Sequence, residues 1–218
     1  MESQVRGGTR WKRFALVMVP SVAATAAIGI GLAQGALAAS FSVSGVDFKV
    51  TADRLEGDDL LQYGSVATGT DLEGNKAAHP VVVSGFSHAE IYNMCQSVVT
   101  PKVPIFGNIT MTINAGGGSE PVKADNIYLD VSQLDTDAEF TNIDIGVAAG
   151  EGSANGKTKM QGNATPKSNP YGFAQRADHA TLKKVEQRAW ATTAGSFKLN
   201  GLKLRLSTGA NECQLGKH

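Results

Sequence analysis

The sequence lacks the short motifs that mark most enzyme active sites. It contains no Gly-x-Ser-x-Gly nucleophile elbow, no Ser-x-x-Lys, Cys-x-x-Cys or His-x-x-x-His pair, and no glycine-rich nucleotide loop. The segment nearest to the elbow is Gly85-Phe86-Ser87-His88-Ala89, which has alanine at the fifth position. A histidine directly after the serine cannot serve as the usual base. The chain therefore looks non-enzymatic, and a hydrolase hypothesis would have to use Ser87 with a histidine, for which His88 is the forced choice.

Metal-ligand patterns are also missing. Asp71 to Asn75 resembles the start of a calcium loop but lacks the glycine at the sixth position and the glutamate at the twelfth, so we interpret it as a hairpin turn. We interpret Asp58-Asp59 and Asp135-Thr136-Asp137 as solvated turn carboxylates. The histidines are interpreted as surface or hydrogen-bonded residues: His79, His88, His179 and His218. No metal and no cofactor is predicted.

The chain has no excess of basic residues. Of its 20 basic and 20 acidic residues, four basic and one acidic lie in residues 1–38, which leaves 16 basic and 19 acidic residues in 39–218. Binding to DNA or RNA needs a basic patch or stripe. A nucleic-acid partner is therefore not expected.

Residues 1–38 have the organisation of an export signal. A basic stretch is followed by an uncharged apolar run over residues 14–33 and then by Ala36-Leu37-Ala38, a signal-peptidase pattern that predicts cleavage between Ala38 and Ala39. The run is also long enough to cross a bilayer as an anchor helix. Release and retention as a membrane anchor both stay open, and both place residues 39–218 outside the cytoplasm.

Only two cysteines are present, Cys95 and Cys213, and both follow the export signal. Thiols oxidise outside the cytoplasm, so an even pair in an exported domain predicts a disulfide. A metal site or a catalytic thiol would need further ligands or a neighbouring base, which the sequence does not offer.

Alternating apolar and polar residues predict an all-β domain over residues 39–218. Examples are the segments 41–50, 105–113, 127–131 and 140–145, with turns rich in Gly, Asn and Asp between them. About ten short strands favour one antiparallel domain, either a β-sandwich or a β-roll. Residues 81–83 look like a strand buried on both faces, and residues 179–190 also suit a helix. The polar, glycine-rich stretch of about 146–172 predicts a mobile surface loop without chemistry.

Two sequence patterns occur more than once in the chain, and we call them internal echoes. Residues 40–51 match residues 196–207 in their apolar, polar and glycine positions, which is explained either by convergent half-buried strands or by equivalent strands of a pseudo-symmetric sheet. An Ala-Asp pair also precedes three apolar strands, at Ala52, Ala124 and Ala177, and convergence is the better explanation there.

A row of large apolar residues lies near the C-terminus: Phe197, Leu199, Leu202, Leu204 and Leu206. If these side chains face one side, they could line a slot for an apolar or lipid ligand. The alternative is that the row is ordinary core.

Several segments resemble a family of exported actinobacterial, Streptomyces-type proteins without established function, which genomes often label "cholesterol esterase". The segments that carry the resemblance are Trp11 to Phe14, Gly35 to Ser40, Phe48 to Asp53 with Leu55 to Gly57, Cys95 to Ser97, Phe140 to Gly146 and Trp190 to Leu206. The resemblance implies an exported whole-chain domain and, as a partner, a small multi-span membrane protein encoded alongside. The esterase label transfers no residue to this sequence.

These observations favour an exported or membrane-tethered protein of the cell envelope with a non-enzymatic binding or assembly role, with a lipid ligand as one option. The alternative is a secreted lipid or sterol-ester hydrolase whose active site has no familiar motif.

Overall fold

The alternating segments form the strands of one antiparallel sheet in the computed structural model, which describes residues 43–161 and 168–216. The predicted signal or anchor, its apolar run 14–33 and the cleavage site at Ala38 and Ala39 lie outside the described residues. The elements in chain order are β1 (Phe48–Thr70), β2 (Lys76–Tyr92), β3 (Met94–Val103), β4 (Gly107–Ala115), β5 (Val122–Thr141), β6 (Asp144–Ala148), the 3₁₀ turn η1 (Ala149–Glu151), β7 (Phe173–Thr193), β8 (Ser196–Lys198) and β9 (Lys203–Thr208).

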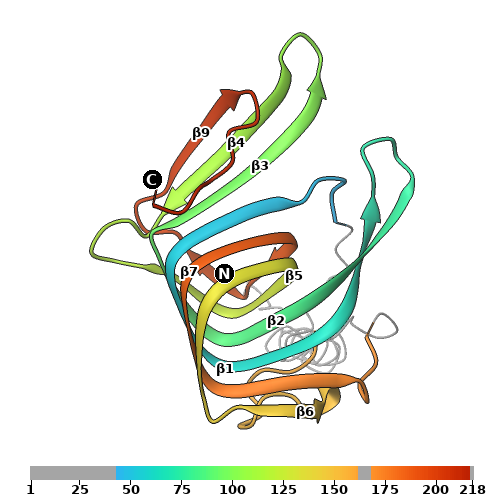
Figure 1. Ribbon diagram of the computed structural model, residues 1–218, viewed down its shortest axis with the longest axis vertical. Coiled ribbons are helices and arrows are strands. Elements are labelled where there is room, and N and C mark those ends of the chain that lie inside the picture. Colours follow the sequence, from blue (N-terminus) through green and yellow to red (C-terminus); the bar gives the residue numbers. More distant parts are fainter. Residues whose placement is uncertain (1–42, 162–167, 217–218) are drawn as a thin grey trace, which may run out of the picture. The chain divides into compact units, whose positions relative to one another are not determined.

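Four long strands curl round and pair in a ring, which we call the body (Figure 1). β1 pairs with β2, β2 with β5, β5 with β7, and β7 again with β1, all antiparallel. β6 adds to β7, and β8 adds to β5. The all-β antiparallel prediction is therefore confirmed. The described strands form a single sheet rather than the two packed sheets of a sandwich.

The body strands are longer than the sequence pattern suggested. β1 has 23 residues, β2 17, β5 20 and β7 21, where about ten short strands were expected. The segment 179–190, which also suited a helix, lies inside β7. Val81 and Val83 are buried but Val82 between them is exposed, so the expectation of a strand buried on both faces is wrong here.

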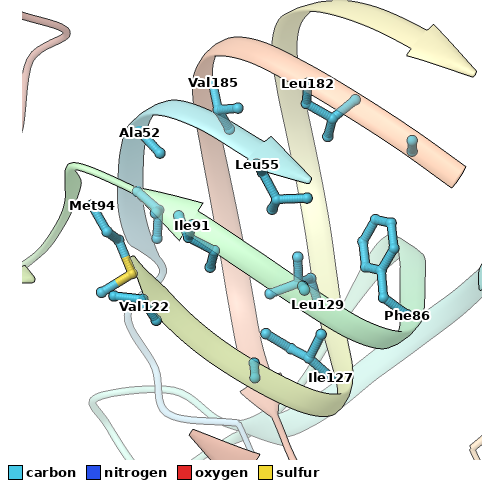
Figure 2. Close-up of a cluster of buried hydrophobic side chains, with 14 of the residues drawn as sticks. Ala52, Leu55, Phe86, Ile91, Met94, Val122, Ile127, Leu129, Leu182 and Val185 are labelled. Atoms are coloured by element: carbon cyan, nitrogen blue, oxygen red, sulfur yellow. The ribbon is translucent and has the colours of Figure 1, made fainter. Parts of the chain in front are cut away.

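The sheet carries a hydrophobic core on each face. The first core lies in the space that the curled strands enclose and includes Phe86, Leu55 and Ile127 (Figure 2). The second includes Tyr63, Val83 and Ala174. Leu60 belongs to the first core and the next residue, Leu61, to the second, and both are almost fully buried. Successive side chains of a strand point to opposite faces, so one strand supplies both cores.

The glycine-rich stretch after β6 helps to cover the second core. Ala149, Ser153, Thr158 and Ser168 are buried, and Ala149 and Met160 pack in that core. The main chain of Gln161 donates a hydrogen bond to the hydroxyl of Tyr63. The expectation of a surface loop is therefore wrong for these residues, because the second face of the sheet needs a cover and this stretch supplies part of it.

No helix in the described part of the chain is long and apolar enough to cross a membrane.

Candidate binding surface

Three strands form a sheet extension that we call the arm: β3, β4 and β9. β3 pairs with the start of β1 through Cys95, Gln96 and Ser97 only. β4 pairs along β3, and β9 pairs along β4, so the described strands reach a free edge at β9. In Figure 1 the arm's strands lie side by side, away from the curled strands of the body.

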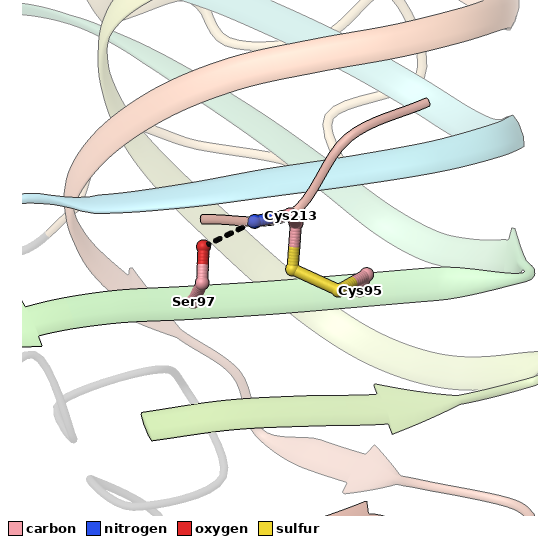
Figure 3. The surroundings of a disulfide bond; sticks show 3 residues. All are labelled: Cys95, Ser97 and Cys213. Atoms are coloured by element: carbon pink, nitrogen blue, oxygen red, sulfur yellow. Dashed lines mark hydrogen bonds between the residues drawn. A yellow bond between two sulfur atoms is a disulfide. The ribbon is translucent and has the colours of Figure 1, made fainter. Parts of the chain in front are cut away.

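One face of the arm is covered by the C-terminal segment that follows β9. Cys213 forms a disulfide with Cys95, with the two Cα atoms 5.9 Å apart, so the predicted disulfide is present (Figure 3). The main chain of Cys213 donates a hydrogen bond of 2.9 Å to the hydroxyl of Ser97, and Thr110 donates one of 2.6 Å to the carbonyl of Gly209. This face is therefore occupied by the protein's own chain.

The opposite face of the arm is apolar and open. Residues paired directly across a sheet point to the same face, which groups Val98 with Met111 and Leu206, and Gln96 with Ile113 and Leu204. Leu204 is 57% exposed and Leu206 69%, while Met111 and Ile113 are half-buried. We call this the apolar face; its members are Val98, Ile109, Met111, Ile113, Leu204 and Leu206.

The apolar face runs on to an opening in the first core. A shallow hollow there is lined by core residues such as Val50, Leu55 and Met94, together with Gln96 and Phe197. Val50 and Gln96 pair directly, and Gln96 shares its row with Ile113 and Leu204, so the hollow and the apolar face lie on the same side of the sheet, with the polar Gln96 between them. The cavity volume is only about 20 Å³. The hollow is therefore too small to enclose a ligand.

The apolar row predicted near the C-terminus is neither ordinary core nor the wall of an enclosed slot. Leu202, Leu204 and Leu206 are exposed on or beside β9, and Phe197 on β8 is 38% exposed at the hollow. Only Leu199 packs against the first core. The apolar face also includes residues of β3 and β4 that the row alone did not indicate. These residues lie about 100 positions before β9 in the sequence, so only the strand pairing brings them beside it.

The two residues of the hydrolase hypothesis do not act on each other. The hydroxyl of Ser87 donates to the carboxylate of Asp59, which is buried and also accepts a hydrogen bond from Asn155. His88 instead places Nδ1 2.7 Å from Asp125 Oδ1. The Ser87 hydroxyl therefore satisfies the buried carboxylate of Asp59 on β1, whereas His88 is held by Asp125 on β5.

His88 belongs to a row of polar side chains across the body. His179 pairs with Asp58, Asp58 with His88, and His88 with Asp125, on four neighbouring strands. His179 Nδ1 lies 2.8 Å from Asp58 Oδ1, and hydrogen bonds from Ser196 and then His88 lower the pKa of Asp125. All four side chains are at least 40% exposed, which makes the row a solvated set of hydrogen bonds.

The carboxylates considered for calcium bind groups of the protein. Asp71 accepts hydrogen bonds from the main chains of Glu73 and Asn75, and the bonds from Asn75 chiefly lower its pKa. Asp135 accepts from Gln133, and Asp137 pairs with Lys184 at 2.9 Å. Within residues 43–161 and 168–216, no three His, Cys, Asp or Glu side chains are grouped so that they could hold a metal.

Comparison with known proteins gives a family but no characterised relative. No curated protein and no solved structure matches the chain. A family model does match residues 44–214, which include both cysteines, all nine strands of the described residues and the whole arm. The chain therefore belongs to DUF6230, a family of unknown function.

Proposed function

We propose that this protein is a non-enzymatic binding protein of the cell envelope, exported or tethered by its N-terminal segment, that contacts its partner through the apolar face of the arm. The observation that carries the proposal is the row of apolar side chains on the open face of the arm, with Leu204 and Leu206 more than half exposed, beside the hollow that Phe197 lines. A folded protein gains nothing by leaving such a surface in water, and contiguous exposed apolar patches commonly mark interaction sites.

The small volume of the hollow favours a partner that lies against the surface of the arm over a ligand enclosed in a pocket. Pockets that hold a drug-sized or lipid-sized ligand have volumes of roughly 300–1,000 Å³, whereas the hollow has about 20 Å³. An apolar or lipid partner would therefore lie against the apolar face, with at most a small part in the hollow. The disulfide suits this role, since it holds the C-terminal segment on the opposite face and keeps the arm in one conformation.

The arrangement of Ser87 and His88 supports a binding role over hydrolysis. A serine nucleophile needs a base within hydrogen-bond reach and donors for the developing oxyanion. Here the Ser87 hydroxyl donates to Asp59, and His88 is hydrogen-bonded to Asp125.

Location outside the cytoplasm is part of the proposal. The disulfide between Cys95 and Cys213 is consistent with an oxidising compartment.

A hydrophobic dye tests the proposal on the native protein. We expect a dye such as 1-anilinonaphthalene-8-sulfonate to fluoresce on the parent, and the double variant Leu204→Ser, Leu206→Ser to lose most of that signal. Leu72→Ser, which removes an apolar side chain of similar exposure from the turn between β1 and β2, is the control and should keep it. Equal dye binding by both variants would contradict the proposal.

A parallel assay addresses the hydrolase alternative. The purified protein is offered a short-chain nitrophenyl ester, and no turnover above that of the Ser87→Ala variant is expected. Turnover that Ser87→Ala abolishes would overturn the non-enzymatic proposal.

A further inference from the structure

We infer that the partner of the apolar face is the surface of a lipid bilayer that contains anionic lipids. The inference rests on the proposed function and names the partner of the same site. Three observations lead to it: the distribution of charge, the form of the arm's tip, and the open edge of β9.

Charge is segregated between the arm and the body. Residues 94–115 and 203–213, which form the arm strands, the turn between β3 and β4 and the C-terminal segment as far as Cys213, contain three basic residues, Lys102, Lys203 and Arg205. Their one acidic residue, Glu212, pairs with Arg188 of β7. The rest of residues 43–216 contains 12 basic and 18 acidic residues, a formal charge of −6. The three basic side chains are exposed, and none forms an ion pair with a described carboxylate. An anionic surface would attract the arm and repel the body.

The tip of the arm carries apolar residues that the fold does not use. Ile105, between β3 and β4, is 99% exposed and has φ 74°, a conformation that is unfavourable for a β-branched residue. The next residue, Phe106, is 59% exposed. The exposed Ile105 side chain gains no packing to offset its backbone conformation. Residues held in this way often belong to functional sites, and an apolar tip beside Lys102 suits the boundary between lipid headgroups and acyl chains.

The outer edge of β9 limits how deeply the arm could insert into a lipid bilayer. Among the described strands β9 has β4 as its one neighbour, so its outer main-chain groups need water or polar headgroups. An open sheet edge is not stable in the hydrocarbon core. Leu204 and Leu206 would enter the outer acyl region while Lys203 and Arg205, on the other face of β9, reach the headgroups. The arm would thus lie on the membrane without crossing it.

The test is flotation of the protein with vesicles of phosphatidylcholine alone and of phosphatidylcholine mixed with phosphatidylglycerol. Each variant is made as the full chain in an exporting host, and its N-terminus is determined by mass spectrometry. Any part of the leader that stays attached is then the same in every variant, so differences report on the arm. We expect the parent to prefer the anionic vesicles. Binding should weaken as salt rises from about 0.1 M to about 1 M, which shortens the Debye length from about 10 Å to about 3 Å.

Two matched pairs of variants separate charge from apolar contact. Lys203→Gln with Arg205→Gln should weaken binding to anionic vesicles about 25-fold, from about fivefold per basic residue near an anionic surface. Lys183→Gln with Lys184→Gln removes the same charge from exposed positions on β7 and should change binding less than twofold. Leu204→Ser with Leu206→Ser should weaken binding to both kinds of vesicle, and Leu72→Ser should not.

Some outcomes would overturn the inference and leave the proposed function standing. One is dye binding that depends on Leu204 and Leu206 in a parent that binds no vesicles. Another is equal binding to both vesicle types with no effect of Lys203→Gln and Arg205→Gln. A third is self-association in sedimentation that the leucine variant abolishes, since the partner would then be a second copy. A parent protein that binds neither vesicles nor dye would contradict the inference and the proposed function together.

Discussion

Leu206 of β9, the last strand in the order of the described sheet, lies directly opposite Met111 of β4, and both side chains point to the face of the arm opposite the C-terminal segment. Leu206 is 69% exposed, so this pair forms part of an open apolar surface. The same register sends Arg205 to the opposite face, across from Thr112. One edge strand therefore presents apolar side chains to one side and basic side chains to the other.

The exposed leucines should contribute to binding and not to folding. Replacing Leu204 and Leu206 by serine removes little buried area, so the free energy of unfolding should change by no more than about 0.5 kcal/mol for each. Urea unfolding followed by circular dichroism measures this. A loss of several kcal/mol would show that the face is part of the core.

The disulfide should stabilise the fold. It closes a loop of 118 residues, for which chain entropy predicts about 4–5 kcal/mol. Cys95→Ser with Cys213→Ser should lower the free energy of unfolding by up to that amount, and a reducing agent should have a similar effect on the parent. Unchanged urea midpoints in reductant would contradict this prediction.

Gly57 is required by a close approach of Phe86. A Cβ at position 57 would lie 2.3 Å from the Phe86 ring, which is buried in the first core, so Gly57→Ala should destabilise the protein by about 1–3 kcal/mol. Gly64→Ala on the same strand is the control, because nothing lies within 4 Å of a Cβ there. That variant should be neutral or slightly more stable. Equal melting temperatures would show that the body repacks around position 57.

Ser87 should prove to be a structural residue. Its hydroxyl donates to Asp59, which is 3% exposed, and hydrogen bonds to buried charged groups contribute about 1.5–3 kcal/mol. Ser87→Ala should therefore lower the free energy of unfolding by about 2 kcal/mol. Ser132→Ala, which removes an exposed and long hydrogen bond, should cost less than about 0.5 kcal/mol. Urea unfolding compares the two, and an unaffected Ser87→Ala variant would refute the structural role.

Asp125 predicts a small acid-sensitive contribution to stability. Hydrogen bonds from Ser196 and His88 lower its pKa below the ordinary value of 3.8. A carboxylate with a lowered folded-state pKa stabilises the fold above its unfolded pKa, and the contribution is lost as the pH falls through the folded value. Asp125→Asn should therefore be less stable than the parent above about pH 4, and the difference should shrink below it. A difference that is the same at pH 2 and pH 6 would contradict this assignment.

Local pattern was sufficient for the fold class, and it failed where the strands bend. Leu60 and Leu61 are adjacent and both buried, one in each core, which breaks the alternation that a straight strand would show. The pattern therefore predicts several short strands where the chain forms one long curled strand. The Ala-Asp pairs have a physical basis, since the three alanines are buried in the first core and the aspartates bind side chains of other strands: Asp53 with Asn93, Asp125 with His88, and Asp178 with Asn142.

The longer echo also has a structural counterpart. Lys49 to Thr51 of β1 pair with β3 on one side of the β3–β4 hairpin, and β9 pairs with β4 on the other side. The two matching segments thus flank one hairpin, although β1 continues into the body and β9 ends at the sheet edge. Sequence pattern indicated the apolar row at Leu202 to Leu206. It could not indicate the partners Val98 and Met111, because their register with β9 depends on pairing between distant strands.

The most direct test of the central claim is photo-crosslinking at the apolar face in intact cells of the native host. A photoreactive amino acid replaces Leu206 in one strain and Leu72 in another, and the products are analysed for attached lipid or protein. The account predicts a crosslinked product from position 206 and little or none from position 72. Equal yields from the two positions, or no product from position 206, would contradict the claim that the arm is the binding surface.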